Sequence, residues 1–418
     1  MTQPNASLQA SRAFGRSDSA GRIGKAAAAV WLVILLGVLP GCGGREPAPR
    51  RSVRESGSRD GADRVLLVYN VADSVSRRVA LYYQERRSVP ERHLLPVRVS
   101  PAGEINLSVY RDQIEAPVRR FLGSLARGDS IDYIVLAKGL PLRIRDGGWS
   151  VDACLGAMDL GRPLVARRDA ARLASLANPY FRRREHFHHG RFAFYLVTRL
   201  DGYTASDAMA LVDRSLRSQG SRGPFLLDLD PRRERGGYGL INQAMRRAAE
   251  ILHARGFEVR VDETVGFAGS ERPLAGYYSW GSNDGGFSRA VYLSMRFNPG
   301  AIAETAVSTS ARTFSRVEGG QSLIADLIAG GVTGVKGYVS EPFSSALCQA
   351  DILFDRYTAG FNLAESFYMA TPFVQWKDVV VGDPICAPYA APAGGVAMTA
   401  DSSDGSRIPS PPWHGGGK

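Results

Sequence analysis

Three hydroxyl side chains stand together after an apolar run in the second half of the chain: Ser308, Thr309 and Ser310. A hydroxyl becomes a nucleophile when a base takes its proton. No histidine occurs between His253 and His414, so the base would be a residue such as Lys336, since a lysine removed from water can lose its proton. One interpretation of this pattern is a hydrolase with one of the three hydroxyls as nucleophile. The interpretation that we favour is that they only cap the loop and the next helix.

A glycine-rich loop, Ser279 to Gly286, precedes this cluster along the chain. It carries Trp280, Asn283 and Asp284. Glycine permits positive φ and close approach of the backbone, so the N–H groups of the loop could hold an anion or stabilise an oxyanion, with Asp284 assisting the hydroxyl. The alternative is a tight connection that Asx turns hold in place.

Lysine is rare in this chain, because only five of the 52 basic residues are lysines. Lys138 and Lys336 each end an apolar run, and an ammonium cannot replace a guanidinium in a tight site, so both are expected to face a pocket. The ligand-binding residues that we predict beside Lys336 are Lys138, Trp280, Asn283, Asp284, Arg312 and Glu341. The alternatives are lysines that extend to solvent and ion pairs with Asp284 and Glu341.

The elements that must position these residues alternate between strands and helices. Short continuous apolar runs predict strands buried in a parallel sheet, and amphipathic runs predict helices. In an open α/β sheet, ligands bind beyond the carboxyl ends of the strands, here in the loops after Ala137, Tyr278, Val307 and Val335. We therefore predict an α/β protein made of two tandem α/β subdomains with mostly parallel sheets.

The boundaries of these elements follow from the apolar periodicity and from glycine stops. The expected strands are Val65–Tyr69, Leu94–Val99, Ile131–Ala137, Phe192–Thr198, Phe225–Leu229, Phe257–Val261, Gly276–Trp280, Ala303–Ser308 and Val332–Val339. The expected helices are Ser74–Arg87, Val109–Leu125, Ala205–Leu216, Leu240–Arg255, Ser322–Ala329 and Phe361–Ala370.

Residues 1–41 have the pattern of a secretory signal peptide. Basic residues precede an apolar run, Ala26 to Pro40, that is too short to span a bilayer and ends beside Cys42. Leu39-Pro40-Gly41-Cys42 resembles a bacterial lipobox, which implies more than one acyl chain on Cys42 and stable membrane anchoring. Because Gly43 follows instead of aspartate, we expect an exported protein anchored to the outer membrane.

Composition divides the rest of the chain. Residues 42–63 are rich in Gly, Arg, Ser and Pro and predict a flexible tether, and residues 391–418 predict a disordered tail. Between them we expect an N-terminal α/β subdomain over residues 64–218 and a second over residues 219–390.

The charge and cysteine patterns exclude several functions. The net charge of +11 is spread over predicted helices and forms no single basic stripe, so we expect no nucleic-acid partner. The cysteines lack metal-ligand spacing, and we expect neither a metal nor a cofactor. The partners that we expect are the membrane, through the lipid, and a peptide or surface ligand.

Several segments, taken in order, resemble gingipain-type cysteine peptidases, which have a caspase-like fold. They are Thr198–Gly202 with the helix Ala205–Leu216, then Gly320–Leu327 leading to Gly330–Gly337, and Gly382-Asp383-Pro384. The chain resembles an exported bacterial family related to those peptidases. The resemblance implies that residues 219–390 are the caspase-like subdomain and that the first half is similar to the subdomain that precedes it in those peptidases.

The same resemblance places the catalytic dyad of those peptidases. Their Gly-His-Gly-Ser motif falls on Ser279-Trp280-Gly281-Ser282, and their Ser-Cys motif falls on Ser308-Thr309. Trp280 therefore stands where the histidine should be, and Thr309 stands where the cysteine should be. A cysteine ionises far more easily than a threonine and a histidine shuttles the proton, so this pair cannot run the peptidase mechanism.

Two functions from different classes remain. In the first, a membrane-anchored module without catalysis binds a peptide, glycan or other ligand in the residual cleft. In the second, a hydrolase uses Ser308, Thr309 or Ser310 with Lys336, Asp284 or a histidine from elsewhere in the chain. We expect the first, because the second requires one of these hydroxyls within hydrogen-bond reach of such a base.

Overall fold

The computed structural model describes residues 61–126, 130–164 and 174–391. All of them belong to one compact unit, Ser56–Lys418, and the other unit, Met1–Glu55, lies outside the described residues. The predicted signal peptide, Cys42, most of the tether and all of the tail after Ala391 therefore lie outside the described part. Among the described residues, no helix has both the length and the apolar character needed to cross a membrane.

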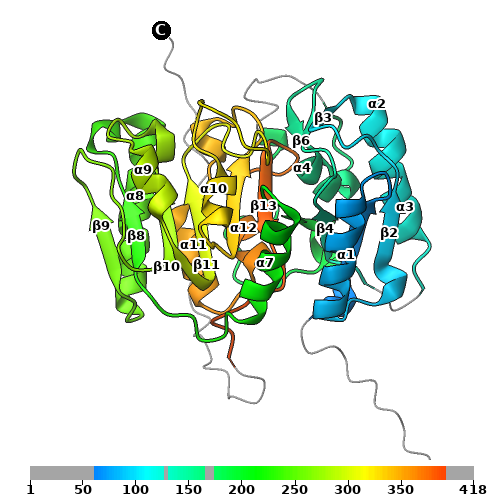
Figure 1. Ribbon diagram of the computed structural model, residues 1–418, viewed down its shortest axis with the longest axis horizontal. Helices are drawn as coiled ribbons and strands as arrows, with labels where there is room; N and C mark the ends of the chain where they lie inside the picture. Colours follow the sequence, from blue (N-terminus) through cyan, green and yellow to red (C-terminus); the bar gives the residue numbers. More distant parts are fainter. Residues whose placement is uncertain (1–60, 127–129, 165–173, 392–418) are drawn as a thin grey trace, which may run out of the picture. The chain divides into compact units, whose positions relative to one another are not determined.

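Ten strands of the described part form one sheet in the order β2-β1-β4-β7-β13-β12-β11-β10-β8-β9 (Figure 1). They are β1 (Val65–Asn70), β2 (Leu94–Val97), β4 (Tyr133–Ala137), β7 (Leu196–Leu200), β8 (Phe225–Asp228), β9 (Val259–Asp262), β10 (Leu274–Ser279), β11 (Phe297–Thr305), β12 (Gly334–Tyr338) and β13 (Asp378–Gly382). A small second sheet contains β3 (Glu104–Ile105), β5 (Arg143–Ile144) and β6 (Trp149–Ser150).

The two halves of the chain share the large sheet. The neighbouring strands within β2-β1-β4-β7 and within β12-β11-β10-β8-β9 are parallel. Strand β13 lies between these groups, antiparallel to β12 and next to β7 at the pair Val381 and Arg199. The prediction of an α/β protein with mostly parallel strands is confirmed. The two sheets that we expected in tandem are one sheet, because a strand from the end of the chain fills the gap between them.

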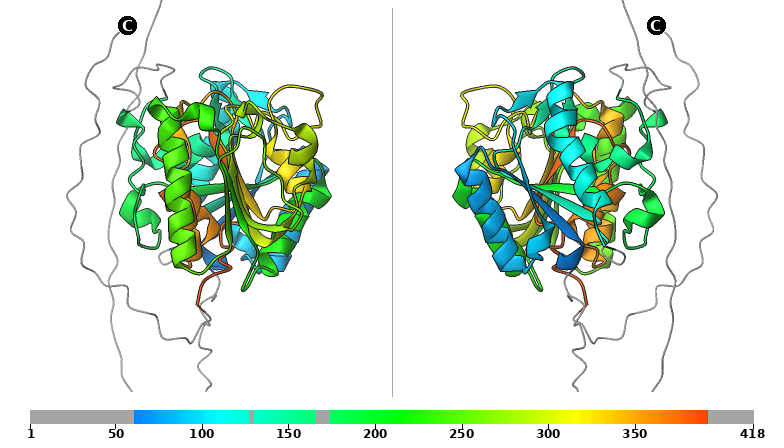
Figure 2. Two further views of the ribbon diagram at one scale, coloured as in Figure 1. Left: turned by 90° about the vertical axis from the view of Figure 1, so that its left-hand side faces the viewer. Right: turned by 90° about the vertical axis from the view of Figure 1, so that its right-hand side faces the viewer.

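Helices cover both faces of the sheet (Figure 2). One face carries α1 (Ser74–Arg87), α7 (Ala205–Leu216), α9 (Arg289–Ser294) and α10 (Ile324–Ala329). The other carries α2 (Leu107–Tyr110), α3 (Ala116–Gly123), α4 (Val151–Gly156), α8 (Gly236–Ala254), α11 (Ala350–Thr358) and α12 (Leu363–Met369). The short helix α6 (His189–Phe192) leads into β7. This three-layer arrangement buries both faces of the strands, as their continuous apolar runs require.

The helix ends that agree best with the prediction are those where a nearby side chain caps the helix. Helices α1 and α7 have the expected bounds, and each begins at a side chain that caps its first turn, Asp73 for α1 and Thr204 for α7. The expected helix Val109–Leu125 is divided into α2, a π-helical turn at Arg111–Glu115 and α3. Pro117 explains the division, because a proline within a helix lacks the N–H that would continue the regular bonding.

Candidate functional site

The loops that follow β8, β10, β11 and β12 surround a hollow of about 360 Å³, which we call the cleft. Its walls are Arg233, Tyr238, Trp280, Asn283, Ala306, Ser308, Glu341, Pro342, Phe343, Ser344 and Leu347. Four of the predicted site residues meet here, namely Trp280, Asn283, Ser308 and Glu341. The cleft lies where the loops at the carboxyl ends of parallel strands converge, as the sequence pattern predicts.

The first half of the chain supports this edge of the sheet. The loop after β4 reaches the residues that follow β12, where Arg143 Nη1 donates to the carbonyl of Val339 (3.2 Å). The hydroxyl of Ser340 donates to the carbonyl of Gly148 (2.5 Å). These bonds fix the chain immediately before Glu341, so the first half positions one wall of the cleft.

Trp280 forms a rigid wall of the cleft. Its side chain is 1% exposed, and its indole N–H donates to Asn242 Oδ1 on α8 (2.8 Å). The guanidinium of Arg233 lies 4.7 Å from the centre of the indole ring, and Tyr238 packs edge-on against the same ring. Because the ring is buried and its polar atom is already bonded, Trp280 fixes the shape of the wall and offers a ligand no free donor.

Ser308 faces the cleft without a hydrogen bond to a base. Within the described residues its hydroxyl has no hydrogen-bond partner, and none of the described histidines lines the cleft. Thr309 donates its hydroxyl proton to Gln321 Oε1 (2.6 Å), which also accepts the Thr309 backbone N–H. Ser310 is buried, and its Oγ accepts a bond from the N–H of Tyr338 (3.4 Å). Two of the three hydroxyls therefore hold the loop together.

Lys336 is separated from these hydroxyls by the sheet. A side chain at Gly337 would point at Ser310 and at Ile324 of α10. Because successive residues of a strand point to opposite faces, the side chain of Lys336 points to the opposite layer. There its ammonium donates to the hydroxyl of Tyr338 (2.8 Å) and lies 3.8 Å from Asp378 Oδ2. The prediction that Lys336 assists Ser308, Thr309 or Ser310 is contradicted by this placement.

A buried carboxyl group accompanies Lys336. Glu304 on β11 is the register partner of Lys336 on β12, and both side chains are fully buried. Burial raises the pKa of Glu304 to about 8, and the positive charge of Lys336 acts against that rise. The pair was not predicted, since nothing in the local sequence indicates that these two residues are neighbours.

Asn283 links the cleft to the hydroxyl loop. Its Nδ2 donates to the carbonyl of Ala306 (2.7 Å), and its Oδ1 accepts from Gln321 Nε2 (3.0 Å). Arg312 binds backbone carbonyls of the same region, including that of Gln321 (2.7 Å), and burial lowers its pKa. Asn283 therefore shapes the cleft, whereas Arg312 stabilises the loop behind it and does not line the cleft as we expected.

Two other predicted ligand-binding residues form ion pairs away from the cleft. Asp284 accepts from Arg232 Nη2 (3.0 Å), and burial raises the pKa of its carboxyl group. Lys138 donates to Asp201 Oδ1 (2.9 Å) and to the carbonyl of Gly202 (2.7 Å). The prediction that these side chains meet in one cleft is wrong for both, because each is held by a partner that the sequence pattern could not identify.

Glu341 is the acidic residue on the rim of the cleft. Its side chain is exposed, and no ion pair within the described residues involves it. Arg233 and Tyr238 were missed by the sequence reasoning, although Arg233 follows an expected strand. The loop after Leu229 also follows the carboxyl end of a strand, which is the signal in the sequence that points to Arg233.

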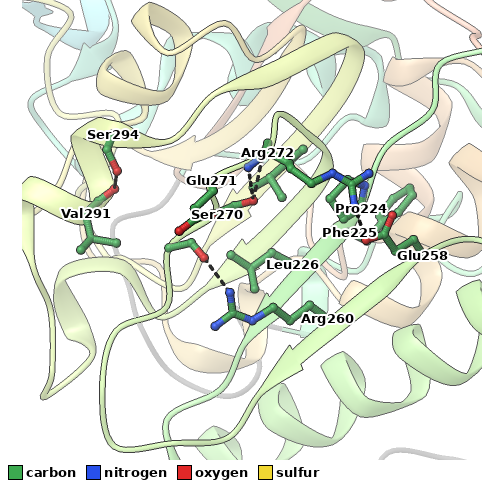
Figure 3. A pocket seen from close by; sticks show the side chains of 12 residues that line it. Pro224, Phe225, Leu226, Glu258, Arg260, Ser270, Glu271, Arg272, Val291 and Ser294 are labelled. Carbon is green, nitrogen blue, oxygen red and sulfur yellow. Dashed lines mark hydrogen bonds and ion pairs between the residues drawn. The ribbon is translucent and has the colours of Figure 1, made fainter.

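Another hollow, of about 540 Å³, lies at the amino ends of β8 and β10 (Figure 3). Three of its four charged side chains have local partners, since Arg260 donates to the carbonyl of Gly269 (2.9 Å) and Arg272 pairs with Glu258 (2.7 Å). The loops that carry ligands in an open α/β sheet lie at the other edge, so this hollow is not the candidate site.

Comparisons with known proteins concern the arrangement of the elements. No family model matches the chain, and no curated protein matches it. The solved complex of the pro- and mature domains of Porphyromonas gingivalis RgpB is similar over 78% of this chain and 79% of that one, with 11% identity and a TM-score of 0.46. A solved structure described as a protease is similar over 80% of each chain, with 10% identity and a TM-score of 0.45.

Proposed function

We propose that this protein is an exported lipoprotein, anchored through Cys42, whose peptidase-like body binds a peptide or other ligand in the cleft without cysteine peptidase chemistry. The observation that carries this proposal is the state of the hydroxyl cluster. Ser308 faces the cleft with no base hydrogen-bonded to it among the described residues, Thr309 is bonded to Gln321, and Lys336 lies on the far face of the sheet.

The cleft suits binding because its walls are formed in advance. Trp280 and Asn283 are held by hydrogen bonds to Asn242 and Ala306, so their positions do not depend on a ligand. Tyr238 is 49% exposed at the mouth, and Glu341 supplies an exposed negative charge there. A preformed concave site with a few polar groups is the usual form of a binding pocket.

The alternative is a hydrolase that uses Ser308, the one member of the cluster that lines the cleft. We expect the purified protein to resist labelling by fluorophosphonate and by thiol-directed warheads, because no base among the described residues is hydrogen-bonded to Ser308 and the three described cysteines are buried. Mass spectrometry of the treated protein checks this. Stoichiometric fluorophosphonate labelling that disappears in Ser308→Ala would establish the hydrolase and overturn the proposal.

A charge on the cleft rim should contribute to binding. We expect Glu341→Ala to weaken a ligand identified on peptide and glycan arrays by roughly 3- to 10-fold, because an exposed charge in a binding site contributes on the order of 1 kcal/mol. Glu271→Ala, which removes another exposed acid at the hollow of Figure 3, is the matched control and should bind normally. Equal affinity of both variants and the unsubstituted protein would place the ligand elsewhere.

The anchor can be tested separately. We expect Cys42→Ser to release the protein from the membrane fraction into the soluble periplasmic or secreted fraction, because the lipid requires the thiol. Fractionation followed by immunoblotting measures the shift, and incorporation of labelled palmitate measures the lipid. Continued membrane association of Cys42→Ser would contradict the lipoprotein assignment and leave the cleft proposal standing.

A further inference from the structure

A third hollow, of about 530 Å³, adjoins the cleft, and we call it the α8 hollow. Its apolar lining consists of Leu240, Ile241 and Ala244 on α8 and Phe343, Leu347 and Cys348 on the opposite loop. Phe343, Ser344 and Leu347 also line the cleft. The two hollows therefore share one wall.

The α8 hollow leaves apolar surface exposed. Leu240 is 63% exposed on its wall, and Tyr238 is 49% exposed on the cleft side of the same helix. The floor is closed, because Ile241 is only 8% exposed and Cys348 only 2%. Leu240 and the apolar floor together offer a surface that a large aliphatic or aromatic group of a ligand would bury.

The wall opposite α8 is held in place by the sheet below it. The N–H of Cys348 donates to the hydroxyl of Tyr338 on β12 (3.1 Å), and its carbonyl accepts from the hydroxyl of Tyr278 on β10 (2.7 Å). Phe343 has a φ of 75°, and its ring stacks on Trp376 with the centroids 5.9 Å apart. The loop adopts a backbone conformation that is unfavourable for phenylalanine because these contacts impose it, so the hollow exists before a ligand arrives.

The far rim of the α8 hollow is basic. Arg182 and Arg247 line it. Arg247 forms an ion pair with Asp351 (2.8 Å), whereas Arg182 donates a hydrogen bond to the neutral side chain of Gln349 (3.0 Å). Beyond the rim, three arginines surround the carboxylate of Asp355: Arg184, Arg255 and Arg356. The surplus of positive charge at this end favours a ligand with an acidic group.

We propose that the ligand of the cleft is an extended peptide that inserts a large apolar side chain into the α8 hollow and places an adjacent acidic residue at Arg182 and Arg247. This inference rests on the proposed function and adds the ligand class. The cleft side contributes the hydroxyl groups of Ser308 and Ser344, which suit the backbone of a peptide better than an alkyl chain.

The test uses the full chain in mild detergent and a positional library of fluorescent octapeptides. The tightest binders should share Leu, Ile, Phe or Met next to Asp or Glu. Leu240→Asp should weaken them roughly 10- to 100-fold, which is the value of burying one large apolar side chain. Leu293→Asp, the same change at a leucine that is 42% exposed on α9, should leave their affinity unchanged. Arg247→Gln should reduce the preference for the acidic neighbour.

The other outcomes are distinct. Peptides that bind without an apolar preference, equally to Leu240→Asp but more weakly to Glu341→Ala, would overturn this inference and retain the proposed function. Binding of dodecanoate in place of peptides, lost in Leu240→Asp, would assign the hollow to a fatty acid and overturn the peptide. Absence of binding of every peptide and of dodecanoate would overturn the inference, and a glycan ligand that depends on Glu341 would still support the cleft.

Discussion

Asp152→Ala is expected to lower the free energy of unfolding by about 3–5 kcal/mol, the usual effect of removing one partner of a buried ion pair. The pair joins Asp152 of α4 to Arg199 of β7, with side chains that are 1% and 0% exposed. Arg199 Nη2 donates to Asp152 Oδ1 (2.5 Å), and Arg199 Nε donates to Asp152 Oδ2 (3.1 Å). The substitution leaves a buried guanidinium without its main counter-charge.

The effect should reach the cleft, because Arg199 also holds the loop after β4. Its two Nη groups donate to the carbonyls of Leu140 and Pro141, both at 2.9 Å. The same loop supports the chain before Glu341 through Arg143 and Gly148. Urea denaturation measures the stability, and binding of the peptide ligand measures the second effect.

A matched control and a second pair of substitutions test whether the unpaired buried charge causes the loss of stability in Asp152→Ala. Glu258→Ala removes a partner of Arg272 in an ion pair whose side chains are 56% and 65% exposed, and it should change stability by less than about 1 kcal/mol. The double substitution Asp152→Leu with Arg199→Met should recover more than half of the loss, since no unpaired charge remains. A loss in Asp152→Ala no larger than that in Glu258→Ala would show that the buried pair does not stabilise the fold.

Glu304→Gln is expected to stabilise the protein increasingly as the pH rises from 4.5 to 8. Burial raises the pKa of Glu304 from 4.5 to about 8 in the folded protein. Below pH 4.5 the carboxyl group is protonated in both states and imposes no penalty. Between pH 4.5 and 8 the unfolded state loses its proton first, so the folded state loses stability steadily. Above pH 8 the penalty is constant.

The size of this effect follows from the pH window. Each pH unit within it is worth about 1.4 kcal/mol, so the difference in stability between Glu304→Gln and the unsubstituted protein should grow by up to about 5 kcal/mol from pH 4.5 to pH 8. The pKa of about 8 already includes the charge of Lys336, which favours the ionised carboxylate. Urea denaturation of both proteins at pH 5 and pH 8 gives the two differences.

Glu271→Gln is the control for this comparison, because it makes the same chemical change at an exposed side chain and should give no growth with pH. The amide introduced by Glu304→Gln retains the shape of the carboxyl group and removes only the titration, so any packing effect is the same at both pH values. A stability difference for Glu304→Gln that is equal at pH 5 and pH 8 would show that Glu304 is not held protonated by burial.

Some residues of the site could be predicted from the strand and loop that carry them, and others could not. The loops after the strands at Tyr278 and Val307 could be predicted to meet, because apolar runs identify parallel strands and their carboxyl ends share one edge. Trp280, Asn283 and Ser308 meet in the cleft for this reason. Lys336 was predicted to join them and does not, because strand residues alternate between faces and Gly337, not Lys336, faces Ser310.

The sequence by itself determined the alternation of strands and helices, the ends of α1 and α7, and the edge of the sheet where the cleft lies. These features depend on apolar periodicity and on capping residues such as Asp73 and Thr204, which act within a few positions along the chain. The lipobox at Cys42 is local in the same way and remains a prediction.

Only the tertiary structure decided which residues became partners. Strand β13 enters between β7 and β12, Arg199 finds Asp152, and Lys336 lies beside Glu304, all through contacts between segments far apart in the chain. The α8 hollow likewise needs α8 and the loop around Phe343 to face each other. Such contacts depend on how whole elements pack, and neither periodicity nor residue type within one element contains that information.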